Sequence, residues 1–80
     1  MPNVLTEAGF RVFFYSDEGF EPPHVHIEYQ GAVSKFWINS VQFAGTMGMN
    51  AAQIKKASLI VKKHEQLILE KWNEFFSKKV

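Results

Sequence analysis

Two histidines and a carboxylate occupy every second position of one short segment, as His24, His26 and Glu28. Side chains alternate between the two faces of a β-strand, so a strand here would place these three together and turn Val25 and Ile27 to the opposite face. Imidazole titrates near neutrality, donates and accepts protons, and ligates metals. This segment is therefore where the sequence most clearly suggests chemistry.

One use of such a pair is metal-independent cleavage of RNA. His24 and His26 would serve as general acid and base, and Lys35 or Arg11 would stabilise the negative charge that develops on the phosphorane. The alternative is a structural or partner-binding role for the pair, which needs no chemistry. The sequence leaves open whether the protein is an enzyme.

A metal site is a further alternative. Two histidines at alternate positions of a strand point two nitrogens toward one spot, but a site needs a third ligand, for which Glu28 and His64 are the candidates. His64 also lies within the apolar stripe of a C-terminal helix, where a hydrogen-bonded core histidine is the simpler interpretation. We assign no metal and no cofactor.

The composition restricts the class of function. The chain has 80 residues, of which 46% are hydrophobic and 15% aromatic, and this predicts one folded domain over residues 1–80. A formal net charge of +1 gives no global basic field, so affinity for nucleic acid would have to come from a local patch. The absence of cysteine excludes thiolate zinc sites, disulfides and cysteine nucleophiles. No apolar run approaches the roughly 20 residues that cross a bilayer, so we expect a cytoplasmic protein without membrane contact.

Residues 1–47 carry the period-two patterning of strands. Strands are expected at residues 10–15, 24–29 and 33–38, and residues 41–43 form a short fourth strand or an extended connection. Pro22 and Pro23 cannot donate to a sheet ladder, which places the start of the middle strand at His24. Gln30-Gly31 supplies a tight reversal, so the sheet over about residues 10–43 is expected to be an antiparallel meander.

Helical patterning begins at about residue 50. Asn50 is a suitable N-cap, Gln53 can complete a capping box, and no Gly or Pro interrupts the chain before Ser77. Apolar residues at spacings of three and four predict one helix over about residues 50–77, roughly 40 Å long. A break near Lys62-Lys63 into two helices is the alternative. One long helix would extend past the sheet, and its surplus apolar surface would suit a protein partner or a second copy of the chain.

The two faces of the sheet are predicted to differ in character. Apolar side chains would pack under the helix, namely Val12, Phe14, Val25, Ile27, Phe36 and Ile38. The reverse face would carry cationic, aromatic and imidazole groups, namely Arg11, Phe13, Tyr15, His24, His26, Glu28, Lys35 and Trp37. Bases stack on platforms of this kind while cations hold phosphates, so the face is a candidate for RNA or DNA binding. An antiparallel sheet also commonly leaves one face in solvent, and Phe13 and Trp37 would then cover it or form an interface.

Several segments carry a combined signature. They are MPNVL at residues 1–5, FFYS at 13–16, EPPHVH at 21–26, KFWI at 35–38, and a Gly48-Met49 turn followed by a helix with His64 and Trp72. Together they resemble the small bacterial domain of unknown function 4160 family. The resemblance implies no settled activity, but it implies a prophage or mobile-element gene beside a second small domain, as in a toxin–antitoxin-like pair. The loop at residues 41–46 lacks the basic residues that the resemblance leads us to expect, which argues against nucleic-acid binding by that loop.

These observations predict an α+β fold, in which a three-stranded antiparallel β-meander, with residues 41–43 as an optional short fourth strand, packs against a long C-terminal helix. The predicted function is an interaction module in a toxin–antitoxin-like two-gene system. It would bind a protein or nucleic-acid partner through the face of His24, His26, Lys35 and Trp37, or through the helix. The alternative is a metal-independent ribonuclease with His24 and His26 as acid and base.

Overall fold

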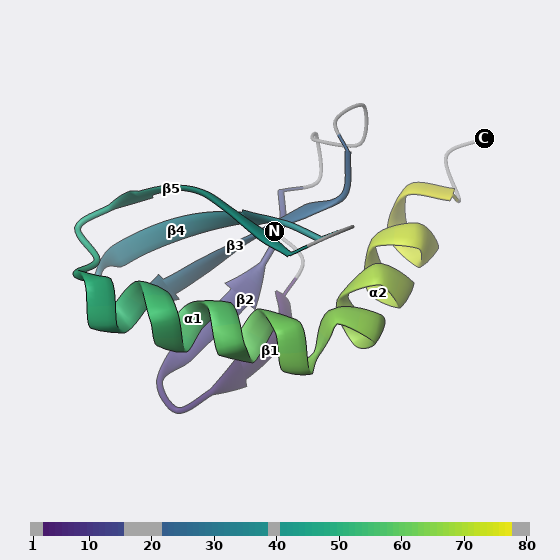
Figure 1. The fold of residues 1–80 in the computed structure, drawn as a ribbon. Helices are drawn as coiled ribbons and strands as arrows, with labels where there is room; N and C mark the ends of the chain where they lie inside the picture. Colours follow the sequence, from purple (N-terminus) through teal and green to yellow (C-terminus); the bar gives the residue numbers. More distant parts are fainter. Residues whose placement is uncertain (1–2, 16–21, 39–40, 78–80) are drawn as a thin grey trace.

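The computed structural model describes residues 3–15, 22–38 and 41–77, and it has an antiparallel sheet and two helices (Figure 1). The strands are β1 (Asn3–Glu7), β2 (Phe10–Phe13), β3 (His24–Tyr29), β4 (Ala32–Trp37) and β5 (Gln42–Met47), followed by helices α1 (Ala51–Lys63) and α2 (Glu65–Ser77). The five strands lie in the sheet in the order of the chain. The α+β class is right, but the prediction of a three-stranded sheet against one long helix is wrong.

Strand β1 is an addition to the predicted sheet. It pairs with β2 through a two-residue turn at Ala8 and Gly9, whose φ angles are 53° and 83°. The turn at Gln30 and Gly31 has nearly the same angles, 50° and 84°, and both fit the type I′ geometry of tight hairpins. The reversal predicted at Gln30-Gly31 is therefore confirmed. Strand β1 escaped prediction because its apolar residues are adjacent rather than alternating, and its register shifts between Asn3 and Leu5.

Strand β5 is longer than the short strand considered at residues 41–43. It pairs with β4 from Val33 opposite Met47 to Trp37 opposite Gln42, with an irregularity between Lys35 and Phe36. Ala44 and Gly45 interrupt the apolar alternation of this segment. A strand whose pattern is broken by a bulge and a glycine gives little sequence signal.

The helical region is broken at His64. Its φ and ψ angles are −109° and 19°, and its N–H donates to the carbonyl oxygens of Ile60 and Lys62. The competing prediction of a break near Lys62-Lys63 thus comes close to the actual position, whereas the single long helix is wrong. Lys62 and Lys63 end α1 and Glu65 begins α2, a distribution of charge that stabilises a helix end followed by a helix start. The predicted start is confirmed, because Asn50 and Gln53 form a reciprocal capping box.

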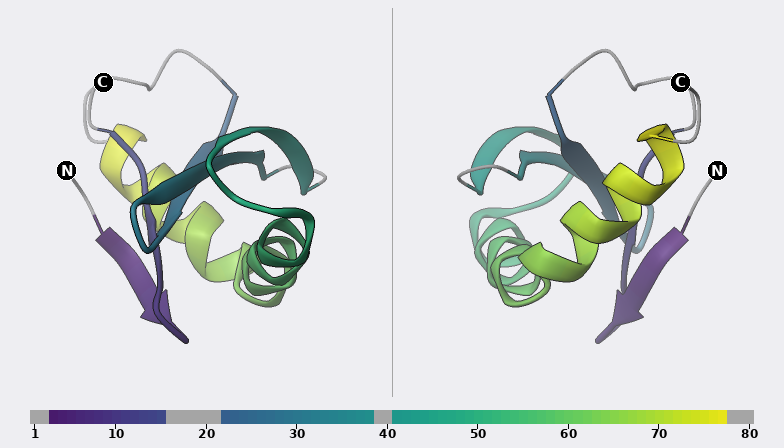
Figure 2. Two further views of the ribbon diagram at one scale, coloured as in Figure 1. Left: turned by 90° about the vertical axis from the view of Figure 1, so that its left-hand side faces the viewer. Right: turned by 90° about the vertical axis from the view of Figure 1, so that its right-hand side faces the viewer.

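The core lies between the sheet and the helices. The six apolar residues predicted to pack under the helix are all buried. Five of them join a cluster with Phe10, Met49, Ala57, Ile60, Val61 and Ile68. Phe14 instead contacts Trp72, Phe75 and Phe76, and we call these four residues the α2 cluster. In Figure 1, α1 runs along the sheet and α2 turns off at an angle; Figure 2 shows the sheet curving around the helices.

The break in the helix changes the surface that was predicted to bind a partner. Because α2 bends back onto Phe14, its aromatic residues are used within the chain. Among the described helical residues, Leu59 is the only large apolar side chain that is well exposed. The prediction of a surplus apolar helix surface is therefore wrong. Neither of the described helices has the length and apolar character of a membrane span.

Candidate ligand-binding face

The strand register brings the predicted site residues together on the reverse face of the sheet. Arg11 lies opposite Glu28 and Phe13 opposite His26 between β2 and β3. His26 then lies opposite Lys35, and His24 opposite Trp37, between β3 and β4. Side chains at alternate positions of β2, β3 and β4 therefore lie next to one another on the same face of the sheet. We keep the name reverse face for Arg11, Phe13, Tyr15, His24, His26, Glu28, Lys35 and Trp37.

Arg11 lies at one edge of the reverse face and is hydrogen-bonded to neighbouring side chains. Its Nη2 and Nε donate to Glu28 Oε1 at 2.8 and 3.1 Å, and its Nη1 donates to Asn3 Oδ1 at 3.1 Å. The guanidinium also lies 4.4 Å from the centre of the Phe13 ring. About a third of each paired side chain is exposed, so this ion pair contributes little to stability. Its effect is to fix the direction of Arg11 and to neutralise its charge.

Lys35 supplies the other cation of the face. Its Nζ lies 4.4 Å from the centre of the Trp37 ring, two positions further along β4. A cation over an indole is attracted by the negative face of the ring. The contact therefore holds the ammonium close to the sheet, over the indole of Trp37.

His26 lies at the centre of a group of rings. Its ring centroid is 4.8 Å from that of Tyr15, 5.6 Å from that of Phe13 and 5.5 Å from that of His24. Phe13 is 2% exposed and Tyr15 is 41% exposed. Phe13 is thus the buried member of this group of rings, while Tyr15 exposes ring surface to solvent and His26 is half-buried.

His24 differs from His26 because it is fully buried. Its Nδ1 is 2.9 Å from the carbonyl oxygen of Pro22, which assigns the Nδ1 proton as the donor in this contact. Its ring is packed near Trp37 and, from α2, near Trp72, at centroid distances of 5.6 and 5.1 Å. The role predicted for His24, acid or base toward a polymer, requires an accessible nitrogen. The buried position suits a structural histidine that packs against the neighbouring tryptophan rings.

A shallow hollow of about 210 Å³ adjoins Lys35. Its lining includes His26, Val33, Lys35, Gly45 and Met47. Gly45 lies opposite Lys35 on β5, and a Cβ at this position would meet no atom within 4 Å. The missing side chain therefore leaves this hollow open beside Lys35. The volume is below that of pockets that enclose whole drug-sized ligands, roughly 300 Å³ or more, so it suits one chemical group of a larger ligand.

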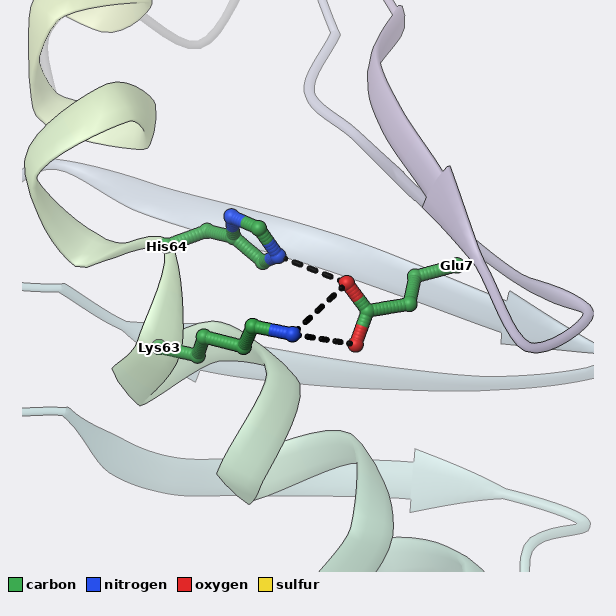
Figure 3. A network of polar contacts seen from close by, with 3 residues as sticks. All are labelled: Glu7, Lys63 and His64. Carbon is green, nitrogen blue, oxygen red and sulfur yellow. Dashed lines mark hydrogen bonds and ion pairs between the residues drawn. The ribbon is translucent and has the colours of Figure 1, made fainter.

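His64 and Glu7 form a polar contact that the sequence did not predict (Figure 3). His64 Nε2 donates to Glu7 Oε1 at 2.8 Å, and Lys63 Nζ lies 3.4 Å from Glu7 Oε2. The hydrogen bond from His64 lowers the pKa of the Glu7 carboxyl most strongly; burial has the next largest effect and opposes it, and the contacts with Lys63 lower the pKa further. The contact was missed because Glu7 belongs to β1, the strand that the sequence pattern did not reveal.

The proposed third metal ligands are engaged elsewhere. Glu28 accepts from Arg11, and His64 is bonded to Glu7. Within residues 3–15, 22–38 and 41–77, no three His, Asp or Glu side chains gather closely enough to hold a metal ion. The histidine pair and its candidate partners therefore do not form a metal centre in this part of the chain.

Comparison with known proteins gives one match. The family model described as Domain of unknown function (DUF4160) matches residues 9–73, from just before β2 to the middle of α2. Neither the curated proteins nor the solved structures gave a match. The matched range covers the whole reverse face and most of the chain. The chain therefore belongs to the family of Domain of unknown function (DUF4160) proteins.

Proposed function

We propose that the domain is a binding module whose reverse face takes single-stranded nucleic acid. The observation that carries the proposal is the alternation of rings and cation on adjacent strands, with Lys35 held over Trp37 beside His26 and Tyr15. Proteins that bind single strands combine rings on which bases stack with cations that follow the phosphates. Stacking needs no base-specific donor or acceptor, so this face would tolerate many sequences.

Each part of the face has a role in this proposal. The exposed ring of Tyr15 and the accessible part of the half-buried Trp37 stack on bases, and Lys35 contacts a phosphate. The hollow beside Gly45 gives the sugar or phosphate room to approach the strand that carries Lys35. Arg11 is already paired with Glu28, so it positions Phe13 rather than adding positive charge. The face therefore neutralises few phosphates, and its affinity would depend only weakly on salt.

The buried position of His24 favours binding over cleavage. A ribonuclease with two histidines needs both imidazoles within hydrogen-bonding reach of the reacting phosphodiester. His24 is covered by Trp72, by Trp37 and by its contact with Pro22. The family resemblance suggested a toxin–antitoxin-like two-gene system, and nucleic-acid binding is the part of that hypothesis that the geometry supports.

The test is a titration of a labelled single-stranded RNA of about ten nucleotides, a length that sheet platforms of this kind cover, followed by fluorescence anisotropy with chelator present. Loss of one stacked base is worth about 1–3 kcal/mol, so Trp37→Ala should weaken binding roughly 5- to 150-fold. Lys35→Gln should weaken it less and should reduce the slope of log affinity against log salt by about 0.7, the value for one phosphate on a single strand. The control is Lys62→Gln, the same change at an exposed position of α1.

The outcomes separate three functions. Equal affinities for the wild type, Trp37→Ala and Lys35→Gln would remove the reverse face from any nucleic-acid role. RNA cleavage that persists with chelator and disappears in His26→Ala would establish the ribonuclease instead. The absence of RNA binding would leave a protein as the partner of this face and would refute the proposal.

A further inference from the structure

We propose that the exposed side of α1 binds an acidic amphipathic helix of a partner protein. This site is separate from the reverse face and does not depend on nucleic-acid binding there. The inference begins with an uneven distribution of charge. Helix α1 contains four of the nine Lys and Arg residues and none of the eight Asp and Glu residues, which leaves five cations and eight carboxylates in the rest of the chain. A protein with a net charge of only +1 therefore has one strongly basic helix.

The lysines of α1 flank a line of apolar residues. Ala52 and Leu59 are seven positions apart, so they lie almost above one another on the helix. Two lysines fall on each side of this line, Lys55 and Lys62 on one side and Lys56 and Lys63 on the other. All six residues are exposed, and Leu59 is 57% exposed. The exposed side of α1 thus combines a narrow apolar line with positive charge along both of its borders.

Most of this charge is not neutralised within the chain. Lys63 Nζ lies 3.4 Å from Glu7 Oε2 (Figure 3), and among the described residues this is the only ion pair that involves a lysine of α1. On the reverse face, by contrast, Arg11 is paired with Glu28. Opposite charges across an interface select the partner and fix its orientation. The other three ammonium groups of α1 therefore favour a partner that presents carboxylates.

A hollow at the N-terminal end of α1 extends the apolar line. Its volume is about 220 Å³, and its lining includes Ala52, Lys56 and the rings of Phe10 and Tyr29, which stack at a centroid distance of 4.2 Å. The volume is below that of pockets that enclose whole ligands, roughly 300 Å³ or more, so it suits one side chain of a larger partner. Because Ala52 belongs both to the hollow and to the line, a single apolar stripe can contact the hollow and Leu59 together.

These features select a helix that has acidic residues on both sides of an apolar stripe. Apolar stripes pack against each other when two helices associate, and the charges beside the stripes determine the choice of partner. Single-stranded nucleic acid requires rings for stacking, and α1 contains no aromatic residue. An amphipathic helix that lies on a membrane inserts several large apolar residues, whereas Leu59 is the only large apolar side chain well exposed among the described helical residues.

An NMR titration with two synthetic peptides tests the proposal. Both peptides have about 14 residues, close to the roughly 20 Å length of α1, and both contain the same numbers of Glu and Leu. Only the ordered peptide places its leucines at spacings of three and four, so that they share one side of a helix. We expect it to shift the amides around Lys56 and Leu59 and to bind more tightly than the scrambled peptide. Equal affinities would overturn the proposal, because charge alone would then explain binding, and so would the absence of shifts on α1 at about 1 mM peptide, the weak end of the affinity scale.

Two variants with matched controls locate the site. Leu59→Ala should weaken binding of the ordered peptide about five-fold or more, as loss of an interface anchor does, without affecting the scrambled peptide. Lys56→Glu should weaken it more than Lys71→Glu, the same charge reversal at an exposed position of α2. Surface substitutions usually change stability little, and circular dichroism checks that each variant is folded. Equal effects of the two charge reversals would refute the proposal, as would a single-stranded RNA that shifts α1 as strongly as the ordered peptide does.

Discussion

The docking of α2 predicts a large loss of stability when Trp72 is changed to alanine. Trp72 is 5% exposed and contacts the rings of Phe14, His24 and Phe76 at centroid distances of 5.3, 5.1 and 4.3 Å. Truncation of a buried tryptophan costs about 3–5 kcal/mol. A chain of 80 residues has a total free energy of unfolding of about 4–12 kcal/mol, at roughly 0.05–0.15 kcal/mol per residue. The variant should therefore lose about a quarter or more of its stability.

Urea unfolding measures this loss, with the fluorescence of Trp37 as the remaining probe. The control is Leu59→Ala, which also truncates a large apolar residue on a helix, but one that is 57% exposed. Its effect should stay within about 0.5 kcal/mol, as is usual for surface positions. If Trp72→Ala lost less than about 1 kcal/mol, the docking of α2 against Phe14 and His24 would be refuted.

Other predictions follow from single contacts. The pKa of Glu7 is lowered in the folded state, so its contribution to stability is complete above the ordinary value of 4.5 and is lost as pH falls through the folded value. The urea midpoint of the wild type should approach that of Glu7→Gln in acid, and a constant difference between them at all pH values would contradict this. Gln30→Asn should stabilise the protein by up to about 1 kcal/mol, because asparagine tolerates the positive φ of this turn better; a lower melting temperature would be the contrary result. Asn50→Ala should cost about 1 kcal/mol through loss of the capping box, and an unchanged urea midpoint would show that the cap does not stabilise α1.

The sequence predicts the centre of the sheet better than its margins. Strands β2, β3 and β4 combine alternating apolar residues with proline or glycine signals at their ends, and these local features act over a few residues. Strand β1 has adjacent apolar residues and a shifted register, and β5 contains a bulge and Gly45. At the bend, His64 is hydrogen-bonded to Glu7, 57 positions away. Contacts at such separations leave no periodic signal in one sequence.

The candidate site was likewise predictable from the sequence only in part. Alternation in each strand was sufficient to place His24, His26, Lys35 and Trp37 on one face, and the structure adds that His26 lies beside Lys35 and His24 beside Trp37. The burial of His24 was not predictable, because it depends on Trp72 from α2, and the position of α2 depends on the break in the helix. The difference matters for function, since an exposed histidine pair suggests cleavage and a buried His24 favours binding.

We propose above that single-stranded nucleic acid binds the reverse face. The most direct measurement is an NMR titration of isotope-labelled protein with an unlabelled single-stranded RNA, observing backbone amides and both tryptophan indoles. We expect chemical-shift changes in Lys35, Trp37 and their neighbours on β3 and β4, with a larger change for the indole signal of Trp37 than for that of Trp72. Shifts confined to the lysines of α1, or no shift on the sheet at saturating RNA, would contradict it.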